Sequence, residues 1–168
     1  YRALTYCARG GNVTKARILI VEDESIIALD LSQHLTSMGY EVIDMVATGE
    51  EAVAKARDYM PDLVLMDIVL RGSMDGITAA AQIKDLLGIP VIFLTAHVDE
   101  STLQRAQITE PHGYIVKPFN VPELRAVIEV TLYKKKLASK FSAKGEYPSA
   151  VSGFSEKLSF SSYQQLEP

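Results

Sequence analysis

Residues 18–23 read Ile-Leu-Ile-Val-Glu-Asp, so four apolar residues run directly into two acidic ones. Three later stretches repeat this arrangement: Leu-Val-Leu-Met-Asp at 63–67, Val-Ile-Phe-Leu-Thr at 91–95 and Tyr-Ile-Val-Lys at 114–117. Short apolar runs bounded by polar turns are typical of buried strands in a parallel sheet. Ligands of such sheets bind just beyond the carboxyl ends of the strands. We therefore expect carboxylates, a hydroxyl and an ammonium group around a single crevice.

Segments with helical character separate these runs. Thr48 is followed three residues later by Glu51, which is the pattern of a capping box. Asp75 with Gly76, then Asp99 and then Asn120, are expected to begin the next three helices. The expected helices cover 24–38, 48–59, 77–87, 100–108 and 121–136, and a further short strand covers 41–45.

Strands alternating with helices in this way predict an α/β fold, in which helices cover both faces of a parallel sheet. A flavodoxin-like doubly wound five-stranded sheet with the strand order 2-1-3-4-5 and five helices fits this succession best. Three segments are expected along the 168 residues: an N-terminal extension at 1–15, the α/β domain at 16–137, and a Ser-rich tail at 138–168 that is flexible or loosely docked.

Composition limits the classes of function. Hydrophobic residues make up 48% of the chain, enough for a substantial core, and the net charge of −4 offers no basic surface for direct binding of nucleic acid. No apolar stretch is long enough to cross a bilayer, and the chain does not open with a signal-peptide pattern. Since the lone Cys7 cannot form an internal disulfide, a cytoplasmic setting is expected.

The polar residues at the strand ends suit phosphoryl transfer. Glu22, Asp23 and Asp67 would repel one another unless a proton or a divalent cation relieved the strain, and oxygen-only ligands favour Mg²⁺. An aspartate can act as a nucleophile toward a phosphoryl group. Lys117 would help the metal to neutralise that group, and the Thr95 hydroxyl could bond to one of its oxygens.

Five motifs, in this order and spacing, resemble those of the two-component response-regulator receiver domain, a CheY-like superfamily. They are Val-Glu-Asp-Glu at 21–24, Leu-Met-Asp-Ile at 65–68, Met-Asp-Gly-Ile at 74–77, Leu-Thr-Ala at 94–96 and Val-Lys-Pro-Phe at 116–119. The resemblance covers residues 16–136, about seven-tenths of the chain. The residues around the first and last motifs resemble those of receivers attached to sensory histidine kinases.

The resemblance implies a phosphorylation-dependent switch in a two-component phosphorelay, rather than an enzyme that turns over a metabolite. Asp67 would accept a phosphoryl group from a histidine kinase or phosphotransfer protein. Glu22, Asp23, Asp67 and the backbone carbonyl of Val69 would hold Mg²⁺, and Lys117 would contact the phosphoryl group. No other cofactor is implied.

The same resemblance assigns Thr95 and Tyr114 to the conformational switch, with Thr95 moving toward the phosphoryl group and Tyr114 turning inward. It also implies a cis bond between Lys117 and Pro118. Receivers commonly bind effectors or form homodimers through the face built by the helix at 100–108, the strand at 114–116 and the last helix. The sequence does not select between these partners.

Three other classes of function are less compatible with the residues. A flavodoxin-like cofactor carrier needs a Ser-, Thr- or Gly-rich loop after the first strand, where this chain has Glu22 and Asp23. A phosphohydrolase with an aspartate nucleophile there needs a second aspartate two residues later, and Ser25 stands there. A phosphate-independent scaffold would usually lack Asp67 or Lys117. Two organisations stay open: a single-domain regulator, or a receiver that belongs to a larger kinase or regulator.

Overall fold

The computed structural model describes residues 15–96 and 100–142, with side-chain surroundings given through residue 140. Contacts divide the chain into two units, Tyr1–Tyr133 and Lys134–Pro168, and the sheet belongs entirely to the first. The strands are β1 (Arg17–Val21), β2 (Glu41–Val46), β3 (Leu63–Asp67), β4 (Val91–Thr95) and β5 (Gly113–Val116).

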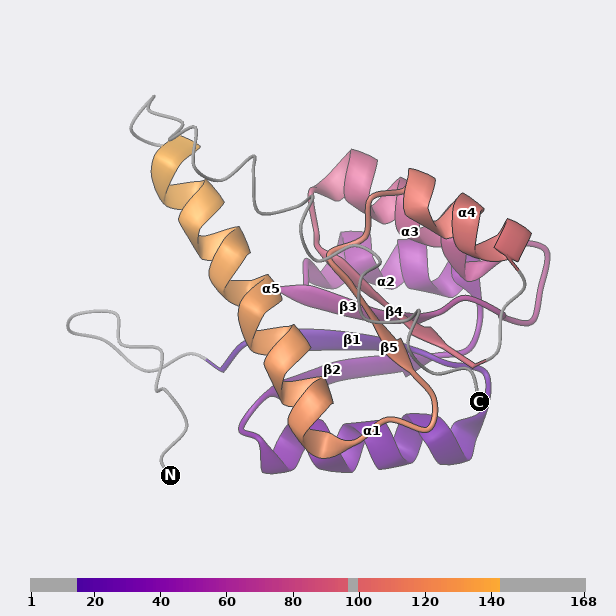
Figure 1. The fold of residues 1–168 in the computed structure, drawn as a ribbon, viewed down its shortest axis with the longest axis horizontal. Helices are drawn as coiled ribbons and strands as arrows, with labels where there is room; N and C mark the ends of the chain where they lie inside the picture. Colours follow the sequence, from indigo (N-terminus) through magenta and orange to yellow (C-terminus); the bar gives the residue numbers. More distant parts are fainter. Residues whose placement is uncertain (1–14, 97–99, 143–168) are drawn as a thin grey trace, which may run out of the picture. The chain divides into compact units, whose positions relative to one another are not determined.

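The five strands form one parallel sheet with the order β2-β1-β3-β4-β5, which confirms the predicted topology (Figure 1). The central strands β1, β3 and β4 are buried almost throughout, as their uninterrupted apolar runs require. Each predicted strand begins or ends within one residue of its observed position. The chain reverses its winding direction between β1 and β3, so the carboxyl ends of these neighbouring strands open onto one crevice.

Helices cover both faces of this sheet (Figure 1). The helices are α1 (Ser25–Ser37), α2 (Gly49–Tyr59), α3 (Gly76–Leu87), α4 (Glu100–Ile108) and α5 (Val121–Ser142). One core cluster joins α1 and α5 to the sheet, through side chains such as Leu31, Leu35 and Ile128. A second cluster, on the opposite face, joins α2, α3 and α4 to the sheet and includes Val53, Ile83 and Ala106.

Three of the predicted helix starts are confirmed by side-chain caps. The Thr48 hydroxyl accepts a hydrogen bond from the backbone N–H of Glu51 at 3.3 Å, and Asn120 accepts one from Glu123 at 2.8 Å. Asp75 caps α3 by accepting from the Thr78 N–H at 2.8 Å. The expected cap at Asp99 lies outside the described residues.

A glycine brings the start of α3 against the end of β3. A Cβ atom at Gly76 would lie 1.8 Å from the carbonyl oxygen of Asp67, a distance that no packing could accommodate. Gly76 also donates its N–H to the carbonyl of Ile68 at 3.1 Å. The absence of a side chain at Gly76 therefore permits the close approach of α3 to the backbone that carries Asp67.

The last helix is longer than predicted. The sequence predicts its end at the Lys134–Lys136 run, but α5 continues through Ser142, into the segment assigned to the Ser-rich tail at 138–168. Lys, Ala and Leu are good helix formers, and the chain has no Gly or Pro between Pro122 and Gly145 to stop the helix. Residues 143–168 and the predicted extension at 1–15, apart from residue 15, lie outside the described part of the chain.

Candidate functional site

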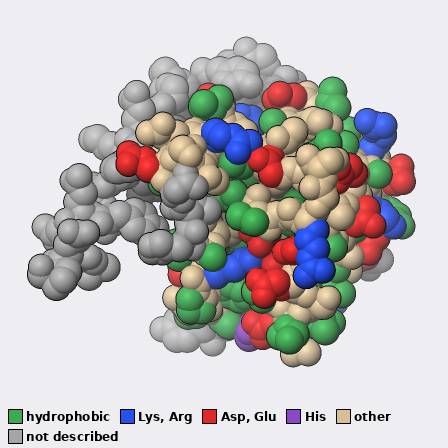
Figure 2. All heavy atoms as spheres, turned by 90° about the vertical axis from the view of Figure 1, so that its right-hand side faces the viewer, with side chains coloured by type: hydrophobic (Ala, Val, Ile, Leu, Met, Phe, Trp, Pro, Cys, Tyr) green, Lys and Arg blue, Asp and Glu red, His purple; other side chains and the backbone are tan. Residues whose placement is uncertain are grey.

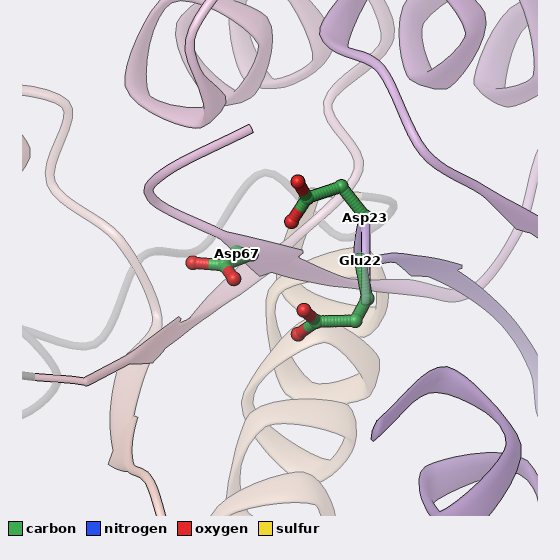
Figure 3. Close-up of side chains that lie close together, drawn as sticks. All are labelled: Glu22, Asp23 and Asp67. Atoms are coloured by element: carbon green, nitrogen blue, oxygen red, sulfur yellow. The ribbon is translucent and has the colours of Figure 1, made fainter. Parts of the chain in front are cut away.

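The ends of four strands supply the candidate site. Glu22 and Asp23 directly follow β1, and Asp67 is the last residue of β3. Figure 3 shows the three carboxylates close together at these adjacent strand ends. Thr95 ends β4, and Lys117 directly follows β5. The sheet thus brings together residues that are up to 95 positions apart in the sequence.

The three carboxylates form one compact acidic cluster. One ligand oxygen from each of Glu22, Asp23 and Asp67 lies within 4.8 Å of the other two. Glu22 is 3% exposed and Asp67 is 7% exposed, so water screens their mutual repulsion poorly. A nearby cation is therefore required to keep these groups ionised together.

Lys117 supplies such a cation. Its Nζ donates to Glu22 Oε2 and to Asp67 Oδ2, each at 2.6 Å. The lysine side chain is 11% exposed, so this two-carboxylate bridge is largely removed from solvent. Lys117 thus directly contacts Asp67, the candidate phosphoacceptor. Its predicted contact with a phosphoryl group stays a prediction.

Burial and pairing oppose each other in the pKa values of this bridge. Burial raises the pKa of Glu22, and the nearby Asp67 charge adds to this, while the hydrogen bond from Lys117 only partly offsets the rise. Burial alone would lower the pKa of Lys117, but its bonds to Asp67 and Glu22 outweigh burial and leave the pKa above its ordinary value. Lys117 therefore stays charged at neutral pH.

Asp67 faces an open hollow. Its second carboxylate oxygen, Oδ1, accepts the backbone N–H of Val69 at 3.0 Å. A hollow of about 480 Å³ lies over it, and its lining residues are Asp23, Glu24, Asp67, Val69, Arg71, Ala96 and Lys117. Figure 2 shows acidic side chains gathered near the middle of the face it presents, with basic side chains beside them. A small anionic group could reach Asp67 from this side.

Thr95 lies at the same edge of the sheet but is not among the residues that line the hollow. Its side chain is 5% exposed, and its hydroxyl donates to the carbonyl of Ala96 at 3.1 Å. The backbone N–H of Lys117 donates to the Thr95 carbonyl at 2.7 Å, which ties the two strand ends together. The Lys117–Pro118 bond is cis, as the resemblance implied.

Tyr114 points into the core beneath α3 and α4. Its ring lies 5.8 Å from the Phe93 ring, centroid to centroid, and packs against the core cluster of that face. Its buried hydroxyl has no hydrogen-bond partner among the described residues. Burial raises the pKa of this phenol to about 12. Thr95 and Tyr114 lie on adjacent strands but are not paired with each other, since the partner of Tyr114 is Phe93.

Sequence reasoning missed one charged residue of the site. Arg71, in the loop between β3 and α3, donates from Nε to Asp23 Oδ2 at 2.9 Å. It thereby contacts one of the candidate metal ligands. An arginine four positions after Asp67 was the only signal in the sequence, and a loop residue's direction cannot be read from periodicity.

The donor set fits a small divalent cation. All of the clustered groups are carboxylates, with no sulfur or imidazole among the described residues of the cluster. Mg²⁺ prefers oxygen ligands and commonly uses one or two carboxylates together with water and phosphate oxygens. The hollow beside Asp23 and Asp67 leaves space for the remaining ligands. Glu22, Asp23 and Asp67 could therefore hold Mg²⁺.

Comparison with known proteins agrees with this arrangement. Residues 18–129 match the family described as the response regulator receiver domain. The transcriptional regulatory protein PdtaR of Mycobacterium tuberculosis is 38% identical over 116 residues, which are 69% of this chain and 56% of the relative. PhoB, the phosphate regulon transcriptional regulatory protein of Rhizobium meliloti, is 34% identical over 123 residues, 71% of this chain and 53% of the relative. The chain thus spans about half the length of these curated relatives.

Solved structures show the same fold. The signal receiver domain of a modulated diguanylate cyclase from Desulfovibrio desulfuricans G20 is 41% identical, with a TM-score of 0.72, over 74% of this chain and 99% of that one. A CheY-like response regulator receiver domain protein from Methanospirillum hungatei JF-1 is 29% identical, with a TM-score of 0.69, over 74% of this chain and 99% of that one.

No helix within residues 15–96 or 100–142 is long and apolar enough to span a bilayer. The matching residues, 18–129, hold nearly the whole sheet and every residue of the acidic cluster and its lysine. The chain therefore belongs to the response regulator receiver domain family of two-component systems.

Proposed function

We propose that this chain is a phosphorylation-dependent switch in which Asp67 accepts a phosphoryl group from a histidine kinase or phosphotransfer protein. One observation carries the proposal: Lys117 Nζ lies 2.6 Å from Asp67 Oδ2 and also 2.6 Å from Glu22 Oε2. A buried ammonium group in this position would pair with a phosphoryl oxygen as readily as with a carboxylate. The open hollow over Asp67 gives the donor access.

Mg²⁺ would be held by Glu22, Asp23, Asp67 and the backbone carbonyl of Val69. When bound, the metal would neutralise charge on the transferred phosphoryl group. The acidic cluster supports this assignment, because one oxygen of each carboxylate lies within 4.8 Å of the others. Burial, which raises the pKa of Glu22, makes the ionised cluster costly without a second cation.

In the transfer step a carboxylate oxygen of Asp67 attacks phosphorus. The P–N bond of the donor phosphohistidine breaks, its electron pair stays on the imidazole nitrogen, and a P–O bond forms to the aspartate. Lys117 orients and neutralises the incoming group throughout. Self-hydrolysis of the acyl phosphate returns the aspartate. The chain would act as a switch and not as an enzyme that turns over a metabolite.

The phosphoryl group would then shift an equilibrium between two arrangements of the chain. Thr95 would turn its hydroxyl toward the phosphoryl group. The Tyr114 side chain, turned inward, would couple this movement to the face formed by α4, β5 and α5. A full reversal of the populations requires a preference of about 5.5 kcal/mol for the active arrangement. We assign that face to effector binding or to homodimer formation, and the protein to the cytoplasm.

The test is intact-mass analysis of the full chain after incubation with phosphoramidate, with and without MgCl₂. We expect the gain of one phosphoryl group that depends on Mg²⁺ and is lost in Asp67→Asn. Asp62→Asn is the matched control, because Asp62 precedes β3 on the opposite edge of the sheet and should leave the gain intact. An equal gain in Asp67→Asn would reject the proposal.

A further inference from the structure

The contact between Arg71 and Asp23 bears on metal binding, and its role there rests on the proposed magnesium site. The guanidinium Nε lies 2.9 Å from Asp23 Oδ2, within the lining of the hollow that also exposes Asp67. The Asp23 side chain is 17% exposed, whereas the Arg71 side chain is 77% exposed. The carboxylate is therefore fixed near the site, while the arginine can exchange this partner for water.

The backbone of Arg71 is anchored although its side chain is exposed. Arg71 forms an isolated parallel β-bridge with Thr48, the residue that caps α2. The next residue, Gly72, has a φ of +108°, and Ser73 donates a hydrogen bond to Glu50 in the first turn of α2. The start of α2 thus holds the loop both at Arg71 and just beyond it, so the guanidinium group stays within reach of Asp23.

Charge determines what this placement does. Glu22, Asp23 and Asp67 carry three negative charges, and Lys117 compensates one of them by its two contacts. Arg71 compensates a second by its bond to Asp23. A divalent cation that binds at Asp23 then meets a cluster with less negative charge and a ligand oxygen already engaged by a donor.

We propose that Arg71 competes with Mg²⁺ for Asp23 and so raises the metal concentration that the receiver needs. The guanidinium must release Asp23 Oδ2, or share it, when the metal binds. A reversible, solvent-exposed ion pair of this kind opposes metal binding only modestly. Arg71 therefore raises the Mg²⁺ concentration needed for half-occupancy without blocking the site.

The alternative role predicts the opposite sign. Outer-shell hydrogen bonds often orient a ligating carboxylate and strengthen metal binding. If Arg71 acted in this way, its removal would weaken Mg²⁺ binding. The competitor role is favoured because Arg71 brings positive charge to the cluster, and because its largely exposed side chain fixes the carboxylate poorly.

Calorimetric titration of the full chain with MgCl₂ tests this proposal. Arg71→Gln should bind Mg²⁺ about two- to fivefold more tightly than the unmodified chain. Arg57→Gln, which makes the same charge change at an exposed position in the last turn of α2, should bind as the unmodified chain does. The advantage of Arg71→Gln should shrink in high NaCl, because salt screens the competing ion pair.

The outcomes separate this proposal from the proposed function. Unchanged or weaker Mg²⁺ binding by Arg71→Gln, with normal binding by the unmodified chain, overturns the competitor role alone. An equal gain in Arg57→Gln also overturns it, because a general charge effect would then explain the result. Failure of every variant and of the unmodified chain to bind Mg²⁺, with normal cooperative unfolding, overturns both proposals.

Discussion

At the scale of single residues, the loss of Lys117 should have a large effect on stability. Replacing Lys117 by Met would leave Glu22 and Asp67 close together, at 3% and 7% exposure, without their shared cation. We expect a loss of about 3 kcal/mol in the free energy of unfolding at pH 7. Urea unfolding followed by circular dichroism measures this loss. Lys55→Met is the matched control, since it breaks a partly exposed pair with Asp44 and should cost much less stability.

The loss in Lys117→Met should depend on pH. Lys117 lowers the pKa of Glu22, so its removal raises further a value that burial already holds above 4.5. A carboxyl group with a raised pKa in the folded state binds more protons there than in the unfolded chain, so stability falls as pH rises through that range. The difference between the two proteins should therefore be small near pH 4 and large near pH 7. A difference independent of pH would contradict this account.

Tyr114 offers a second prediction at this scale. Its buried hydroxyl finds no partner among the described residues, so Tyr114→Phe should leave stability at pH 7 unchanged or raise it by about 1 kcal/mol. Folding raises the phenol pKa from 10.0 to about 12. Ionisation of this group therefore leaves the free energy of unfolding unchanged below pH 10 and lowers it as the pH rises toward 12, because the unfolded chain ionises more readily. The variant should lose less stability over that range.

Unfolding at pH 7, 9 and 11 measures this difference between Tyr114→Phe and the unmodified chain. Tyr133→Phe is the control, because its side chain is 62% exposed and removal of its hydroxyl should not change stability at neutral pH. A loss of more than about 1 kcal/mol in Tyr114→Phe at pH 7 would show that the hydroxyl is stabilised in the folded chain.

At the scale of elements, Asp75 links α3 with α4. It caps α3 through the Thr78 N–H and also accepts from Arg105 of α4, at 2.6 Å. Asp75→Asn keeps a capping oxygen but loses the ion pair, so it should cost less than about 1 kcal/mol, as Arg105→Gln should. Asp75→Ala loses both interactions and should cost about 1–2 kcal/mol. Urea unfolding compares the three variants, and equal losses for the two Asp75 variants would contradict the capping role.

The elements themselves were largely predictable, for a physical reason. Strands buried on both faces must be continuous apolar runs, and such runs are short enough to place within a residue. The caps at Thr48, Asp75 and Asn120 rest on hydrogen bonds to residues three positions later, so the local sequence pattern predicts them. The end of α5 was missed because lysines favour a helix interior as much as a helix end.

The candidate site was predictable only in part. The topology of a parallel sheet brings the residues after β1, β3 and β5 together, so the acidic cluster and Lys117 follow from the order of the strands. Arg71 was not foreseen, since its bond to Asp23 depends on a loop anchored to the start of α2. That anchoring involves residues more than twenty positions apart, which no local pattern reveals.

At the scale of the whole molecule, the receiver fold places three carboxylates and a lysine at the carboxyl edge of the sheet. Lys117 and Arg71 balance three carboxylates only partly, so the cluster could hold a further cation. We propose that the site then receives an anionic phosphoryl group, which Asp67 carries. Everything proposed for Thr95, Tyr114 and the face of α4, β5 and α5 depends on it.

The most direct test locates the modification. The full chain, phosphorylated with phosphoramidate and Mg²⁺, is reduced with borohydride, which converts an aspartyl phosphate into homoserine, and its peptides are sequenced by mass spectrometry. We expect homoserine at position 67 and at no other aspartate, and none without Mg²⁺. Homoserine at another aspartate, with Asp67 unchanged, would contradict this proposal.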